Sequence, residues 1–119
     1  MYKHQRLDVW QESRRFVVRV YELTRAFPKE ERFGFTSQLR RAAVSIPSNV
    51  AEGAGRGTER SFAHFVRIAA GSASEVETQL LIARDLELAS AEELDEAVSD
   101  VQRIRKMLWS LGEHYSKSA

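Results

Sequence analysis

Arginines carry most of the binding chemistry that this sequence can offer, because the guanidinium group stays charged and binds phosphate through paired N–H donors. Arg56, Arg60 and Arg67 occur near the start of a predicted helix and, counted as helix, share the face opposite its apolar residues. Together with arginines of the preceding segments, they predict a basic surface that binds RNA or DNA phosphates. These further candidates are Arg14, Arg15, Arg19, Arg40 and Arg41.

The same arginines also fit a structural interpretation. In it, Arg41, Glu52, Arg56 and their neighbours form ion pairs that fix the second predicted helix and its turn. The two interpretations are compatible, because oligomerisation would repeat a modest basic patch several times and convert weak contacts into avidity.

No residue pattern in the sequence predicts catalysis or metal binding. The chain has no cysteine, and neither His64 nor His114 has the glutamate three positions earlier that a di-iron helical bundle requires. Ser45 and Ser48 have no histidine near them in the sequence, and the glycines of EGAGRG at 52–57 lack the Gly-Lys-Ser/Thr of a P-loop. We therefore predict a protein that is not an enzyme and that uses no metal or cofactor.

The charges of the chain are divided unequally between its two halves. Residues 1–67 contain 13 Lys and Arg against 7 Asp and Glu, a net charge of +6. Residues 68–119 contain 5 against 10, a net charge of −5, which leaves +1 for the whole chain. Such a division indicates a basic and an acidic surface, suited to a polyanion or to complementary self-association; a patchwork solvated surface is the alternative.

Composition favours a globular, cytoplasmic protein. Hydrophobic residues make up 43% and charged residues 29% of the 119 residues, a balance typical of one globular domain, here 1–119. The longest uncharged run, residues 42–51, contains Pro47 and is too short to cross a bilayer, so no membrane partner is expected. The N-terminus lacks the apolar segment of a signal peptide, and a chain without cysteine fits a reducing compartment.

Apolar residues at helical spacing predict four amphipathic helices, of which the first two surround the proline-containing stretch. In the first, Asp8 is the predicted N-cap and Pro28 ends the helix. The second begins from a predicted N-cap at Thr36, and its apolar phase continues unbroken across Pro47. That continuity predicts a helix kinked at the proline.

The remaining helices are separated by short loops. Gly53, Gly55 and Gly57 are expected to end the second helix, and Thr58 to cap the third. The SAEE segment at 90–93 predicts a capping box at the start of the fourth helix. Long amphipathic helices with short loops predict an all-α, antiparallel up-and-down four-helix bundle with a Pro-kinked second helix.

Several apolar residues fall outside the core stripe of their helix. Because they are distributed over all four helices, they indicate a second apolar surface and predict a homo-oligomer. These interface candidates are Val18, Val44, Ile82, Leu86 and Trp109.

A set of short segments is distinctive in combination: Phe27-Pro28, Phe33-Gly34, Gln38-Leu39-Arg40-Arg41-Ala42, SIPSNVAEG at 45–53, and Gly71-Ser72 followed by Glu75. Together they resemble the small four-helix bundle proteins encoded in intervening sequences of bacterial 23S rRNA genes, also labelled S23 ribosomal proteins. The resemblance extends over residues 7–111.

The resemblance implies a helical bundle that assembles into a ring-like homo-oligomer, a pentamer, without enzymatic activity. Similar proteins include the accessory subunit of diversity-generating retroelements, which binds nucleic acid and a reverse transcriptase through the basic outside of its barrel. Nucleic acid and a nucleic-acid-processing protein are thus the implied partners. The shared motif of the family maps onto Ser45, Pro47, Asn49, Glu52, Gly53 and Arg56.

We interpret this motif as chiefly architectural. Asn49 lies at the edge of the apolar face, where its amide is expected to pair with backbone groups that Pro47 leaves free. The predicted function is therefore a non-enzymatic homo-oligomer that binds nucleic acid, or a nucleic-acid-processing partner, through its arginines. The alternative, supported by the near-zero net charge and the surplus apolar positions, is a structural or protein-interaction scaffold without nucleic-acid affinity.

Overall fold

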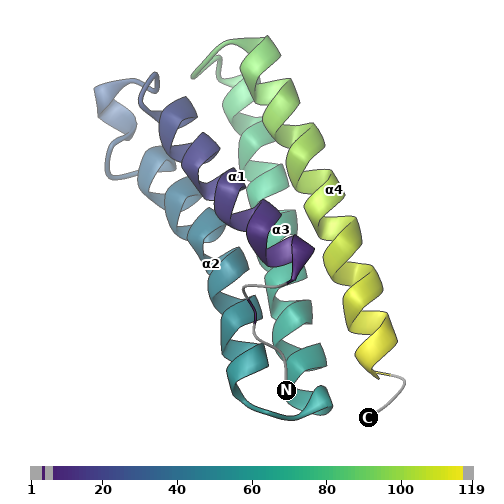
Figure 1. Ribbon diagram of the computed structural model, residues 1–119. Helices are drawn as coiled ribbons and strands as arrows, with labels where there is room; N and C mark the ends of the chain where they lie inside the picture. The colour runs from purple at the N-terminus through teal and green to yellow at the C-terminus, as the bar shows by residue number, and fades with distance from the viewer. Residues whose placement is uncertain (1–3, 5–6, 117–119) are drawn as a thin grey trace.

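Four antiparallel α-helices form the protein in the computed structural model, which describes residue 4 and residues 7–116. They are α1 (Asp8–Thr24), α2 (Phe35–Gly55), α3 (Glu59–Asp85) and α4 (Ala91–Ser116), with a short 3₁₀ helix, η2 (Lys29–Glu31), between α1 and α2. Each helix runs back along its predecessor, so the topology is up-and-down (Figure 1). The predicted all-α, four-helix fold is confirmed, and the described ranges contain no strand.

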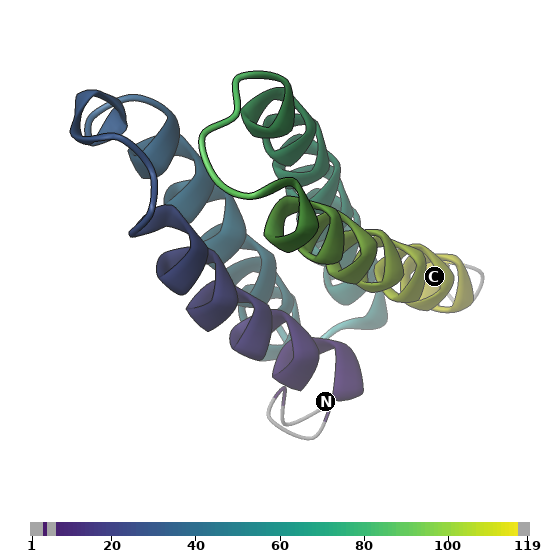
Figure 2. The same ribbon diagram turned by 90° about the horizontal axis from the view of Figure 1, so that it is seen from above.

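The helices pack around one apolar core along the length of a particle measuring 45 × 20 × 20 Å. α1 packs on α2 and α4, and α3 packs on the same two helices, as the view from above shows (Figure 2). Every helix contributes completely buried side chains to this core. Among the largest are Val20 of α1, Leu39 and Ile46 of α2, Phe62 and Leu80 of α3, and Leu94 and Leu108 of α4.

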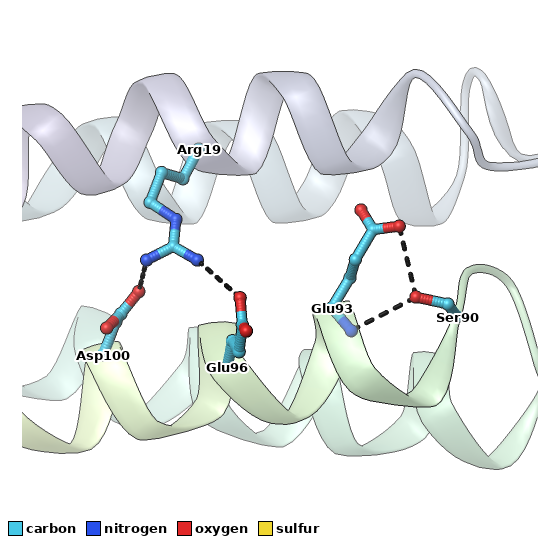
Figure 3. A network of polar contacts seen from close by, with 5 residues as sticks. All are labelled: Arg19, Ser90, Glu93, Glu96 and Asp100. Atoms are coloured by element: carbon cyan, nitrogen blue, oxygen red, sulfur yellow. Dashed lines mark hydrogen bonds and ion pairs between the residues drawn. The ribbon is translucent and has the colours of Figure 1, made fainter.

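Side-chain caps fix the starts of α3 and α4. The Thr58 hydroxyl accepts a hydrogen bond from the N–H of Ser61 at 3.1 Å, which confirms the predicted cap. At α4, the Ser90 hydroxyl accepts from the N–H of Glu93 at 3.2 Å and donates to its carboxylate at 3.1 Å (Figure 3). The first hydrogen bond of the predicted capping box is therefore present, from the N–H of Glu93 to the Ser90 hydroxyl. The second differs, because the Glu93 carboxylate accepts from the Ser90 hydroxyl and not from the Ser90 N–H.

The cap at Thr58 can be measured directly. Thr58→Ala should lower the free energy of unfolding by about 1 kcal/mol, because an N–H in the first turn of α3 loses its acceptor. Thr78→Ala is the matched control, since the Thr78 hydroxyl only donates to the carbonyl of Ser74 on the exposed surface of the same helix. Urea unfolding of the two variants should show a loss for Thr58→Ala alone, and equal stabilities would contradict the capping role.

Two predicted helix starts are wrong, by one residue at α1 and by two residues at α2. α1 begins at Asp8 itself, with Leu7 at the N-cap position and no side-chain cap. Asp8 acts instead as an acidic residue in the first turn, where the helix dipole favours it. α2 begins at Phe35 rather than after Thr36, because the preceding 3₁₀ turn places the Glu31 carboxylate 3.3 Å from the N–H of Phe35.

The glycines of the 53–57 stretch differ in their roles. α2 continues through Gly53 and Gly55, so the expectation that all three glycines end the helix is wrong. Only Gly57, with φ of 83°, takes the left-handed conformation that ends a helix. Pro47 lies inside α2, and the kink at that position stays a prediction.

Candidate nucleic-acid interface

The eight candidate arginines are distributed over three helices. Ion pairing divides them into a group that is neutralised by neighbouring carboxylates and a group that is not. On α1 lie Arg14, Arg15 and Arg19; on α2 and its C-terminal cap lie Arg40, Arg41 and Arg56; on α3 lie Arg60 and Arg67.

Arg19 of α1 forms ion pairs with two carboxylates of α4. Its guanidinium bonds to the carboxylates of Asp100 and, at 3.3 Å, Glu96, both on α4 (Figure 3). Arg103 makes the converse bridge, from α4 to Glu12 of α1 at 2.6 Å. These contacts join α1 to α4 and leave Arg19 poorly suited to a phosphate ligand, because two carboxylates already offset its charge.

Arg56 and Arg67 are also paired. Arg56 lies 2.8 Å from the carboxylate of Glu52, one helical turn earlier, and 5.0 Å from the centre of the Phe65 ring. Arg67 reaches Glu113 of α4 at 3.7 Å and the hydroxyl of Ser116 at 3.0 Å. The structural interpretation therefore applies to the Glu52–Arg56 pair. Because all these groups are about half exposed, each pair contributes at most about 1 kcal/mol.

Four candidates have neither an ion pair nor a side-chain hydrogen bond with any residue that the structure describes: Arg14, Arg15, Arg41 and Arg60. Arg14 and Arg15 line a hollow of about 530 Å³ on α1, where the Arg14 guanidinium lies 5.3 Å from the centre of the Trp10 ring. Arg60 lies exposed in the first turn of α3. Their donors are available to an anion.

Arg40 is positioned by neutral groups rather than by a carboxylate. It donates to the Thr24 hydroxyl at 2.8 Å and to the Tyr21 carbonyl at 3.3 Å, and its guanidinium lies 4.4 Å from the centre of the Tyr21 ring. These contacts fix its orientation and leave its charge uncompensated.

A second hollow, of about 500 Å³, brings Arg40 and Arg41 together with Arg32. Sequence reasoning missed Arg32, because this residue lies in the connector before α2 and belongs to no helix face. We call Arg14, Arg15, Arg32, Arg40 and Arg41 the α1–α2 arginines. All five belong to α1, α2 or the connector between them, and each lines one of these two hollows. None of them makes an ion pair with a residue that the structure describes.

The family motif in α2 makes mostly local contacts. The Ser45 hydroxyl donates to the Ala42 carbonyl, and the Asn49 amide donates to the Ser45 carbonyl, each at 2.8 Å. Pro47 has no N–H to donate to the carbonyl of Ala43. The expectation that the Asn49 amide pairs with this freed carbonyl is wrong, because the amide donates to the carbonyl of Ser45. These contacts, and the burial of Gly53 against α3, favour an architectural role for the motif.

The predicted interface residues are exposed. Val18, Val44, Ile82, Leu86 and Trp109 all present large apolar surfaces to solvent on this single chain. Phe33, in the connector before α2, is also exposed, at 88%. The oligomer itself stays a prediction.

Neither a metal centre nor a membrane span was found in the part of the chain that the structure describes. Residues 4 and 7–116 contain no cluster of three or more histidine, aspartate or glutamate side chains placed to hold a metal ion. None of the described helices is both long and apolar enough to cross a membrane.

Comparisons with known proteins agree with the helical architecture. A family model described as 23S rRNA-intervening sequence protein matches residues 5–110. A crystal structure of a protein of unknown function from the S23 ribosomal protein family of Bacteroides thetaiotaomicron superposes with a TM-score of 0.80 at 27% identity. The match covers 87% of this chain and 96% of that one. No sequence among curated proteins matches this chain.

Proposed function

This chain belongs to the 23S rRNA-intervening sequence protein family, and on that premise we propose that it is a non-enzymatic homo-oligomer that binds nucleic-acid phosphates through the α1–α2 arginines. The observation that carries the proposal is the absence of an ion pair at these five arginines within the described residues, although Arg19, Arg56 and Arg67 are all paired. A guanidinium without a carboxylate partner retains its full attraction for a phosphate.

The charge division of the chain supports the same surface. α1 and α2 belong to the half with a net charge of +6, whereas α4 belongs to the half with −5. Helix α4 has three Lys and Arg against six Asp and Glu, a net charge of −3, whereas α1 (three against three) has 0 and α2 (two against one) has +1. A polyanion is therefore repelled by α4, and its attraction to α1 and α2 depends on the individual arginines that have no carboxylate partner. The exposed apolar side chains support self-association, which would repeat the α1–α2 arginines around an assembly and add avidity.

Arg41 provides the sharpest test because it is exposed and makes no ion pair with a described residue. Fluorescence anisotropy titrations with labelled RNA and DNA across a salt series would give the slope of log K against log salt. Arg41→Ala should weaken binding and reduce the magnitude of that slope by about 1, the value for one lost phosphate contact. Lys106→Ala is the control, because it removes the same charge from an exposed position on the acidic helix α4.

Two outcomes would count against the proposal. If Arg41→Ala and Lys106→Ala weaken nucleic-acid binding equally, binding depends on the net charge of the protein and not on the α1–α2 arginines. Absence of binding to any nucleic acid at low salt would favour the second candidate function, a protein-interaction scaffold. The observation behind that candidate is the set of exposed apolar side chains on all four helices, Trp109 among them.

A further inference from the structure

Phe33 is the one phenylalanine of six that projects into solvent. The others are buried or half-buried in the helical core, whereas Phe33 is 88% exposed in the connector between η2 and α2. An aromatic ring in this position gives up the stabilisation that burial would provide. Its surroundings indicate what ligand would cover it.

The hollow beside Phe33 combines aromatic rings and cations. Its volume of about 500 Å³ falls within the range of small-ligand sites. Tyr21 and Phe33 contribute rings, Arg32, Arg40 and Arg41 contribute guanidinium groups, and no carboxylate is among the lining residues. Such a composition fits an anionic ligand that also has a flat apolar face.

The cations in this hollow are arranged around the rings. The Arg32 guanidinium lies 5.3 Å from the centre of the Phe33 ring, and that of Arg40 lies 4.4 Å from the centre of the Tyr21 ring. Hydrogen bonds to the Thr24 hydroxyl and the Tyr21 carbonyl hold Arg40 in place before any ligand arrives. Arg41 has no ion pair with a described residue and keeps its donors for a phosphate.

We infer that this hollow binds an unpaired nucleotide, whose base stacks on Phe33 and whose phosphate is bound by Arg32 and Arg41. The inference rests on the proposed function and deepens it, because it specifies single-stranded nucleic acid. Bases inside a duplex are already stacked on both faces and cannot lie on a side chain, whereas unpaired bases stack on exposed aromatic rings and guanidinium planes.

The test compares a labelled single-stranded oligonucleotide with a duplex of the same length, using anisotropy. Phe33→Ala should weaken single-strand binding about 5- to 150-fold, the range for losing one base–aromatic stack, and should change duplex binding less than about twofold. Phe33→Tyr keeps a ring and should restore most of the affinity. Leu81→Ala is the control, because it truncates an exposed apolar side chain on α3 that neither lines the hollow nor belongs to the interface candidates.

Light scattering after gel filtration should show the same subunit number for wild type and Phe33→Ala. A change in that number would overturn the inference and assign Phe33 to a contact between copies of the chain. Unaltered single-strand affinity in Phe33→Ala, or wild-type binding to duplex alone, would overturn it while leaving the proposed function standing. Failure of the wild-type protein to bind any nucleic acid would refute the proposed function itself.

Discussion

Replacing Phe62 by alanine is expected to lower the free energy of unfolding by about 3–5 kcal/mol, which is a large part of the 5–15 kcal/mol typical of a domain. Phe62 is completely buried near the start of α3. Its ring meets that of Tyr115, on α4, edge to face with centres 5.0 Å apart. The variant loses the burial of the ring and this aromatic pair, and it leaves a cavity that the helices cannot close completely.

Urea unfolding followed by circular dichroism would measure the effect, with Phe33→Ala as the matched control. The two substitutions remove the same atoms, but Phe33 is 88% exposed, so its replacement should change stability by no more than about 0.5 kcal/mol. Similar losses in the two variants would contradict the burial of Phe62. The control also shows whether a loss of nucleic-acid binding in Phe33→Ala could come from unfolding.

The architecture could be predicted from the sequence because apolar side chains at helical spacing dominate the free energy of a bundle. The spacing of Leu39, Ile46 and Val50, for example, puts them on one face of a helix, and all three are completely buried. The ends of the helices were less predictable. The start of α2 depends on Glu31, which reaches the first turn only because the chain forms a 3₁₀ helix before it.

The proposed binding surface could be predicted only as a set of residue types. Arg19 looked equivalent to Arg15 in the sequence, but its partner Asp100 lies 81 positions away, and only the packing of α1 on α4 brings the two together. Conversely, Arg32 and Phe33 lie in a connector, where periodicity carries no information about neighbours. The local sequence signal that remains is an apolar aromatic residue between an arginine and a glycine outside any helix.

Gly53→Ala should destabilise the protein, although alanine is the better helix former. A Cβ at position 53 would lie 2.8 Å from the Phe65 Cβ and 3.3 Å from the Phe62 Cα, so α2 and α3 would have to move apart. Overpacking of this kind costs about 1–3 kcal/mol, and the helix propensity of alanine offsets about 1 kcal/mol of it. We expect a net loss of up to about 2 kcal/mol in the free energy of unfolding.

Gly71→Ala separates the two contributions to this effect. Gly71 lies inside α3, as Gly53 lies inside α2, but a Cβ at position 71 would meet no atom within 4 Å. At position 71 only the higher helix propensity of alanine acts, so Gly71→Ala should raise the free energy of unfolding by about 1 kcal/mol. Opposite signs for the two variants in thermal unfolding would attribute the loss at Gly53 to the close approach of α2 and α3. A gain at both positions would show that the helices can separate without cost, and the architectural role of the motif around Gly53 would then lose its physical basis.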